Sequence, residues 1–378
     1  MPIEWLLISL PAVFVIGWFA ARLDIRHIRK NAGQLPRAYE EGLSHLLRDE
    51  KDKALDTLLR ARPPNPDSVE LQFAIGALSR QRGELRRAMT AHREICERED
   101  LSADLRRRGL WELAQDYLTM GFMDYAEKTA QPLLNHPDYR ERALAMLLSL
   151  KQRDGDYAKA LELTDKMPPD ALLFRRAVKS QLLCQCALAE EDAAKKTRLL
   201  ESALAENPDC ARAMILLGEA ALGAGKYSEA ATRFLAVERC QPRYLWLAAE
   251  GLHNARRLDG KAETGRRDLL RWLSVHPSPP LFECVYKILA KTPAGIGGLA
   301  RAGMLTKNGA APALCWIDEQ SAKASGEERD AFEALRETLR TAAGRHFTCS
   351  GCGYEVNDFV WQCPGCLAWE SFRPRQSS

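Results

Sequence analysis

A period of 34 residues runs through most of the chain and constrains its fold more than any other feature. Gly42 and Gly76 are separated by this spacing, as are Ala54 and Ala88. A period of that length corresponds to one pair of helices, in which small residues recur where the two backbones approach closely. Because one helix pair cannot bury its apolar face alone, the pairs must stack on their neighbours. The period therefore predicts a mainly α-helical body built by repetition.

The clearest copy of the period spans 211–244 and has the pattern of a tetratricopeptide repeat. Gly218 stands where the two helices pack closest, Gly225 marks the turn, and Phe234 lies on the second helix. The predicted repeats within 35–279 are 35–68, 69–102, 107–140, 141–174, 177–210, 211–244 and a degenerate seventh, 246–279. A further helical segment, 280–343, falls out of register. The stack is expected to form a superhelix whose groove binds peptides or helices of partner proteins, although the repeats could also act only as a spacer.

The N-terminal segment 1–21 contains an uncharged run from Trp5 to Ala21. As a helix, this run would be about 26 Å long, at the short end of a membrane span. No Lys or Arg precedes it and no small-residue cleavage motif follows it, so a retained transmembrane anchor is favoured over a secretory signal. Arg and Lys residues gather in the juxtamembrane linker 22–34, and the positive-inside rule places that side in the cytoplasm. We therefore predict a single-pass membrane protein with most of the chain on the cytoplasmic side.

The charge balance and the motifs narrow the function classes. The chain has 54 basic and 51 acidic residues, a net charge of +3, so no overall positive field marks a nucleic-acid-binding protein. Its seven histidines are dispersed, and no zinc-protease, serine-hydrolase or kinase motif occurs. We predict that the chain is not an enzyme and that its partners are proteins and the membrane. Its oligomeric state is left open.

The eleven cysteines fall into two groups. Seven are scattered through predicted helices at no disulfide-framework spacing, which favours a reducing compartment. Cys184 and Cys186 are two residues apart on a predicted helix, point in different directions and are interpreted as small buried hydrophobic residues. The other four cysteines form two C-x-x-C pairs near the C-terminus: Cys349, Cys352, Cys363 and Cys366.

Two C-x-x-C turns facing each other would make a tetrahedral sulfur site for one metal ion, zinc or a single iron. The alternative, two structural disulfides, conflicts with a cytoplasmic location. The metal and five aromatic residues would support a very small rubredoxin-like ribbon over 345–373: Phe347, Tyr354, Phe359, Trp361 and Trp369. We expect this ribbon to pack against the repeats.

The anchor, the repeats and the terminal sequence "WQCPGCLAW" together resemble the lipopolysaccharide assembly protein B family of Gram-negative bacteria. Similarity also extends to "AYEEGLSHLLRDEKDKALD" in the first repeat and "RGELRRAMTAH" in the second, and so covers nearly the whole chain. The resemblance implies that Cys349, Cys352, Cys363 and Cys366 hold the metal, which in this family is usually described as iron. Rubredoxins commonly have glycine after the fourth cysteine, where this chain has Leu367.

The same resemblance implies a non-enzymatic regulator at the bacterial inner membrane. Such a protein limits lipopolysaccharide synthesis by acting as an adaptor for the protease FtsH, which degrades the deacetylase of the lipid A pathway. It is also implied to gather other lipopolysaccharide assembly proteins at the membrane. Two alternatives are a rubredoxin-type electron-transfer protein, which the departure at Leu367 disfavours, and a general membrane-bound protein scaffold.

Overall fold

The computed structural model describes residues 37–60, 69–168, 172–290, 311–343 and 347–374. The predicted anchor 1–21 and the linker 22–34 lie outside these ranges. Within them, no helix combines the length and the hydropathy that a bilayer span requires.

The chain divides into two compact units, 1–143 and 144–378. The elements of the first unit are α2 (Arg37–Leu47), α3 (Lys51–Arg60), α4 (Val69–Gln81), α5 (Leu85–Glu97), α6 (Ala103–Thr119), α7 (Met123–Ala130) and the 3-10 helix η1 (Gln131–Asn135). Helix α8 (Pro137–Arg153) begins in this unit and continues into the second.

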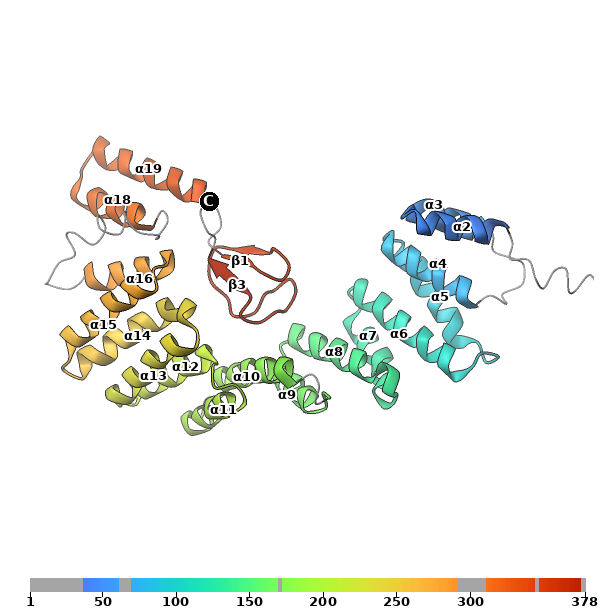
Figure 1. The fold of residues 1–378 in the computed structure, drawn as a ribbon, viewed down its shortest axis with the longest axis horizontal. Coiled ribbons are helices and arrows are strands. Elements are labelled where there is room, and N and C mark those ends of the chain that lie inside the picture. Colours follow the sequence, from blue (N-terminus) through green and yellow to red (C-terminus); the bar gives the residue numbers. More distant parts are fainter. Residues whose placement is uncertain (1–36, 61–68, 169–171, 291–310, 344–346, 375–378) are drawn as a thin grey trace, which may run out of the picture. The chain divides into compact units, whose positions relative to one another are not determined.

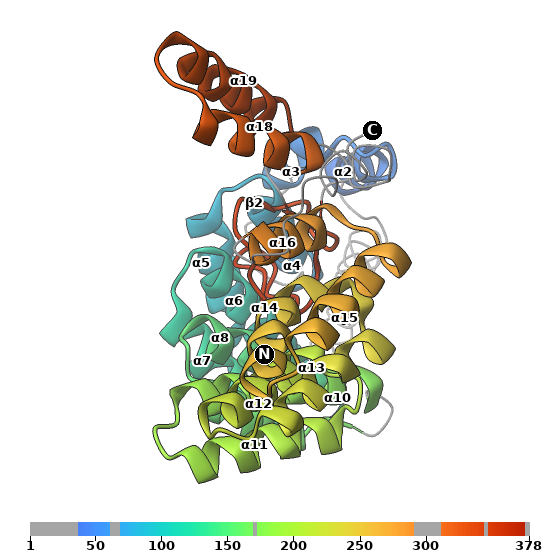
Figure 2. The same cartoon turned by 90° about the vertical axis from the view of Figure 1, so that its left-hand side faces the viewer.

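In the second unit, the described residues before the C-terminal ribbon are mainly helical (Figures 1 and 2). Its helices are α9 (Tyr157–Asp165), α10 (Leu172–Ala189), α11 (Ala193–Glu206), α12 (Ala211–Gly223), α13 (Tyr227–Cys240), η3 (Pro242–Tyr244), α14 (Leu245–Leu258), α15 (Ala262–Val275), α16 (Pro279–Ala290), α18 (Ala311–Lys323) and α19 (Glu327–Ala343). The ribbon strands are β1 (Phe347–Cys349), β2 (Glu355–Val356) and β3 (Phe372–Pro374), in the order β2-β1-β3 with both pairings antiparallel.

The described chain is thus mainly helical, with tetratricopeptide-like helix pairs followed by a small ribbon. Three first helices, α6, α8 and α10, begin before the predicted repeats at 107, 141 and 177. The repeat pattern records the residues at which helices pack, whereas a cap sets where a helix begins. At α6 the cap is Ser102, whose side chain accepts a hydrogen bond from the backbone N–H of Leu105.

Close packing inside one helix pair depends on Gly218. A Cβ at this position of α12 would lie 2.7 Å from a ring carbon of Phe234 on α13, whose side chain is fully buried. Helix propensity alone would favour alanine over glycine here. An alanine at this position would nevertheless clash with the ring of Phe234, because a fully packed ring cannot move aside without displacing its own neighbours.

Replacing Gly218 with alanine is therefore expected to lower the free energy of unfolding by about 1–3 kcal/mol, the usual effect of overpacking a core. Gly223 on the same helix is the matched control, because a Cβ there would meet no atom within 4 Å. Its replacement by alanine should be neutral or slightly stabilising. Urea unfolding of both variants measures the difference, and equal stabilities would contradict the proposed contact.

The pair α4 and α5 places His92 where α12 and α13 have Phe234. Its imidazole packs on Gly76, where a Cβ would lie 2.3 Å from His92 Nε2. His92 Nδ1 lies 2.5 Å from Asp116 Oδ2, and Arg80 donates to the other oxygen of that carboxylate. Both His92 and Asp116 are fully buried. His92 is therefore a packing residue of this helix pair.

Candidate metal centre and its contact with the helical repeats

The two C-x-x-C turns have the same backbone conformation. In the first turn, the carbonyl oxygen of Cys349 accepts a hydrogen bond of 2.9 Å from the N–H of Gly353. In the second, the carbonyl oxygen of Cys363 accepts one of 2.9 Å from Leu367. Gly353 and Leu367 both have a left-handed backbone, with φ of 75° and 62°. The two turns are therefore built alike, although only the first has glycine at the left-handed position.

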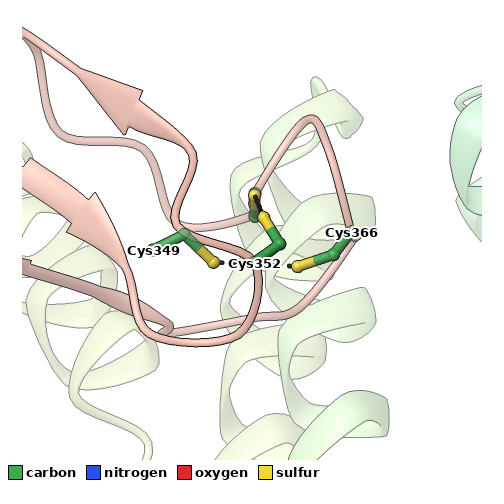
Figure 3. A group of neighbouring side chains, drawn as sticks. Cys349, Cys352 and Cys366 are labelled. Carbon is green, nitrogen blue, oxygen red and sulfur yellow. Dashed lines mark hydrogen bonds between the residues drawn. The ribbon is translucent and has the colours of Figure 1, made fainter.

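These turns bring together the sulfur atoms of the four cysteines that were predicted to bind the metal. All four lie within 4.8 Å of one another. Cys349 Sγ is 3.7 Å from Cys366 Sγ, and Cys352 Sγ is 3.6 Å from Cys363 Sγ. Figure 3 shows the labelled side chains pointing toward a common centre. Four sulfurs bound tetrahedrally at about 2.3 Å from a metal would be about 3.8 Å apart, so the cluster fits one metal ion.

The surroundings prepare the sulfurs unequally for a metal. Burial opposes ionisation of Cys349, but its hydrogen bonds with Ser371 and with two backbone N–H groups outweigh it and lower the pKa of this thiol to about 6. Burial and the neighbouring sulfurs raise the pKa of Cys363 to about 12. Four thiolates this close repel one another unless a cation lies between them. The donor set therefore supports a single metal site, and zinc and iron both suit it.

Leu367 adopts the conformation that glycine usually provides. A non-glycine residue in the left-handed region costs about 1–2 kcal/mol, and this chain accepts that cost in its second turn. The sequence departure from rubredoxins therefore leaves the turn geometry intact.

Replacing the left-handed glycine of the first turn, Gly353, should weaken metal binding. Gly353→Ala is expected to weaken metal retention by roughly 5–30-fold, because it adds about 1–2 kcal/mol of backbone strain. Gly351→Ala in the same turn is the control, since a Cβ there would make only ordinary contacts of 3.5 Å or more. Competition with a chelator measures retention for both variants. Similar losses for the two would show that the left-handed turn does not matter.

The core of the ribbon differs from the predicted one. Its buried side chains are Phe347, Phe372, Cys349 and Cys363, and Phe372 was not among the predicted aromatic residues. Tyr354 is 47% exposed, so assigning it to the core was wrong. Phe359, Trp361 and Trp369 are only partly buried and pack against clusters that include helix residues. They serve mainly as a contact surface, because a ribbon this small has little interior.

The ribbon packs against the helices of its own unit, as expected from the sequence. Tyr244 contacts the rings of Trp361 and Phe359, with centroids 4.8 and 5.6 Å apart. Trp246 stacks on Phe347 at 5.8 Å. In Figure 1 the ribbon lies beside the first helices of the pairs from α8 to α14. It therefore occupies part of the surface that was predicted to bind partners.

An amide oxygen shared by two donors attaches one side of the ribbon to α8. Gln152 Oε1 accepts hydrogen bonds from Gln362 Nε2 at 2.9 Å and from Trp369 Nε1 at 2.8 Å. Gln152 is only 8% exposed, so both bonds are shielded from water. They fix the position of the Trp369 ring against the helix.

Glu370 fastens the other side and is the ribbon residue with the most polar partners on the helices. Its Oε1 accepts from Gln181 Nε2 at 2.7 Å, and its Oε2 accepts from Gln241 Nε2 at 3.1 Å and Arg243 Nη2 at 3.4 Å. Its carbonyl oxygen accepts from the hydroxyl of Tyr244 at 3.3 Å. Burial raises the pKa of Glu370, while Gln241 and nearby arginines oppose the shift.

A buried arginine completes this network. Arg212 on α12 is 5% exposed and donates to Gln185 Oε1 at 2.6 Å and to Gln181 Oε1 at 3.5 Å. Its guanidinium lies 5.7 Å from the ring of Trp361 and 5.5 Å from that of Trp369. Sequence reasoning missed the residues of this network. A polar residue on the inner side of a helix was the available signal, but its partners lie more than a hundred residues away in the ribbon.

The fold and the site define a class: a tetratricopeptide-like helical protein with a C-terminal four-cysteine metal-binding ribbon. Residues 347–374 match a family described as a rubredoxin metal binding domain. The chain is 23% identical, over 396 aligned residues, to lipopolysaccharide assembly protein B of Escherichia coli strain K12, and 24% identical, over 391, to that of Haemophilus influenzae. Each alignment covers 98% of both proteins. The chain is therefore similar, over nearly its whole length, to proteins named lipopolysaccharide assembly protein B.

Some solved helical structures resemble this chain only weakly. Yeast Tom70 has a TM-score of 0.36 and 12% identity, with 80% of this chain and 77% of that one covered. The Naa15/Naa10 complex bound to HypK has a TM-score of 0.39 and 13% identity, with coverage of 80% and 46%.

Proposed function

We propose that this chain is a membrane-tethered adaptor that regulates lipopolysaccharide synthesis. In this role segment 1–21 anchors the chain in the bacterial inner membrane, and the repeats hold protein partners on the cytoplasmic side. The adaptor promotes degradation of the lipid A pathway deacetylase by FtsH and gathers other lipopolysaccharide assembly proteins. It performs no chemical step of its own.

The observation that carries this proposal is the extent of the similarity. Proteins named lipopolysaccharide assembly protein B match the chain over 98% of both lengths, from the N-terminal segment through the helices to the ribbon. Helix pairs of this kind act in many proteins as surfaces for other proteins. This extent of similarity supports assigning the anchor, the partner-binding repeats and the ribbon of a tethered adaptor to one chain.

Depleting the chain in the bacterium that encodes it tests the proposal. We expect the deacetylase to persist longer after synthesis is stopped and lipopolysaccharide to accumulate. Restoring the full chain should reverse both effects, whereas a version lacking 1–21 should fold but not reverse them. An unchanged deacetylase half-life after depletion would refute the FtsH step, and full rescue by the truncated version would refute tethering.

Electron transfer is the second candidate, favoured by the exposure of Cys352 and Cys366 at the sulfur cluster. A solvent-facing iron site could exchange electrons with a partner. Metal analysis and a reversible visible spectrum of the purified protein would distinguish this function. Stoichiometric zinc, or full regulation by a zinc-substituted protein, would exclude it.

A further inference from the structure

The helices hold the ribbon through a site with a definite chemistry. We call it the acid–indole seat and define it by Gln152, Gln181, Arg212, Gln241 and Tyr244. Two of its amides donate to the carboxylate of Glu370, and a third accepts from the indole N–H of Trp369. The seat therefore recognises an aromatic residue that is followed directly by an acidic one.

The charge of the seat requires an anion. Arg212 is buried, and its direct partners, the side-chain oxygens of Gln181 and Gln185, are uncharged. A buried guanidinium without a counter-charge is strongly unfavourable. Burial lowers the pKa of Arg212, and the nearby carboxylate of Glu370 is one of the groups that oppose this shift. Glu370 itself forms an ion pair of 3.4 Å with Arg243. The helices are thus built to receive a carboxylate, and in this structure the ribbon supplies it.

The four-cysteine site maintains the backbone conformation of Trp369 and Glu370, the two residues that occupy the seat. Cys366 is four residues before Glu370, and the intervening turn passes through the left-handed Leu367. Glu370 is itself left-handed, with φ of 52°, and its N–H donates to the carbonyl oxygen of Trp361. Such a backbone is unfavourable in a free chain. Without four sulfurs drawn together, little in a ribbon of this size would maintain it.

We propose that the acid–indole seat is a protein-binding site, that Trp369 and Glu370 are its resident intramolecular ligand, and that loss of the metal frees it for a partner. The partner is a protein segment in which an aromatic residue precedes Asp or Glu. Metal loading then decides whether this surface is closed by the ribbon or open. The proposal concerns binding by the purified protein and does not depend on the role in lipopolysaccharide synthesis.

The test uses the full chain and a fluorescent peptide with the chain's own residues 367–374, LAWESFRP, beside a matched peptide with glutamine for glutamate. Fluorescence anisotropy compares the metal-loaded protein with the metal-free Cys349→Ser/Cys352→Ser variant. We expect the metal-free protein to bind LAWESFRP at least tenfold more tightly than the loaded protein does. The glutamine peptide should bind at least fivefold more weakly, and adding Arg212→Met should reduce the difference between the peptides, with Arg243 accounting for the remainder.

Amide exchange of α10 and α12 reports in parallel whether the ribbon has left the helices. Absence of peptide binding once it has left would overturn the proposal, as would equal binding of the two peptides. A ribbon that stays bound without metal would overturn the gating step. A metal-loaded Trp369→Ala/Glu370→Ala variant provides a second route to an open seat that needs no cysteine replacement. It too should bind LAWESFRP, and its failure to do so would count against the site.

Discussion

Replacing Cys363 with serine is expected to unfold the ribbon and to detach it from the helices. The free energy with which four thiolates bind a structural metal is about 10–16 kcal/mol, and in very small domains it is the free energy of folding. The ribbon has few other buried side chains, so its strands should not survive metal loss. The partly buried rings of Phe359, Trp361 and Trp369 would then lose their contacts on the helices together.

Metal analysis and amide exchange followed by mass spectrometry measure this effect. Exchange should accelerate in β1 and β3 and on the seat helices α10 and α12, while α4 in the other unit keeps its rate. Cys186→Ser is the matched control, because Cys186 is a half-buried cysteine of α10 outside the sulfur cluster. Protected ribbon strands in a metal-free protein would show that aromatic packing alone maintains this fold.

Glu370→Ala is expected to detach the ribbon without emptying the metal site. The substitution removes the acceptor of Gln181, Gln241 and Arg243 and leaves the guanidinium of Arg212 buried without a carboxylate. Leaving a buried donor without its acceptor costs about 1–3 kcal/mol. The four sulfurs lie outside this network, so metal content should stay at the wild-type level.

Asp358→Ala is the control for this prediction, because Asp358 is an exposed acidic residue of the same ribbon. Limited proteolysis of the ribbon and tryptophan fluorescence should change strongly for Glu370→Ala and little for Asp358→Ala. Loss of metal from Glu370→Ala would contradict the separation between holding the metal and holding the helices. Equal behaviour of the two variants would mean that the buried network contributes little to the contact.

The ribbon gives the second unit a long-range connection that a simple repeat stack lacks. In a repeat array each pair normally contacts only its neighbours, so stability is close to a sum over neighbours. Here Gln152 on α8, Gln181 on α10 and Tyr244 at η3 all bind one ribbon. The ribbon therefore links helices that are not adjacent in the stack, and its loss should affect them together.

Local sequence patterns predicted the helix pairs and the metal site because the interactions that form them join residues close together in the sequence. A helix pair needs a glycine or alanine where backbones meet, and Gly218 is such a residue. A four-sulfur site needs two tight turns, and the spacing of Cys349, Cys352, Cys363 and Cys366 supplies them.

The sequence by itself determined the helical repetition, the cysteine cluster and the presence of aromatic residues around it. Only the tertiary structure decided what those aromatic residues do, since Trp361 and Trp369 pack on Arg212 and its neighbours instead of filling the ribbon. It also decided that Glu370 is buried by helices more than a hundred residues away. No periodicity records such a pairing, because a buried charge is stabilised only by partners that the complete fold brings to it.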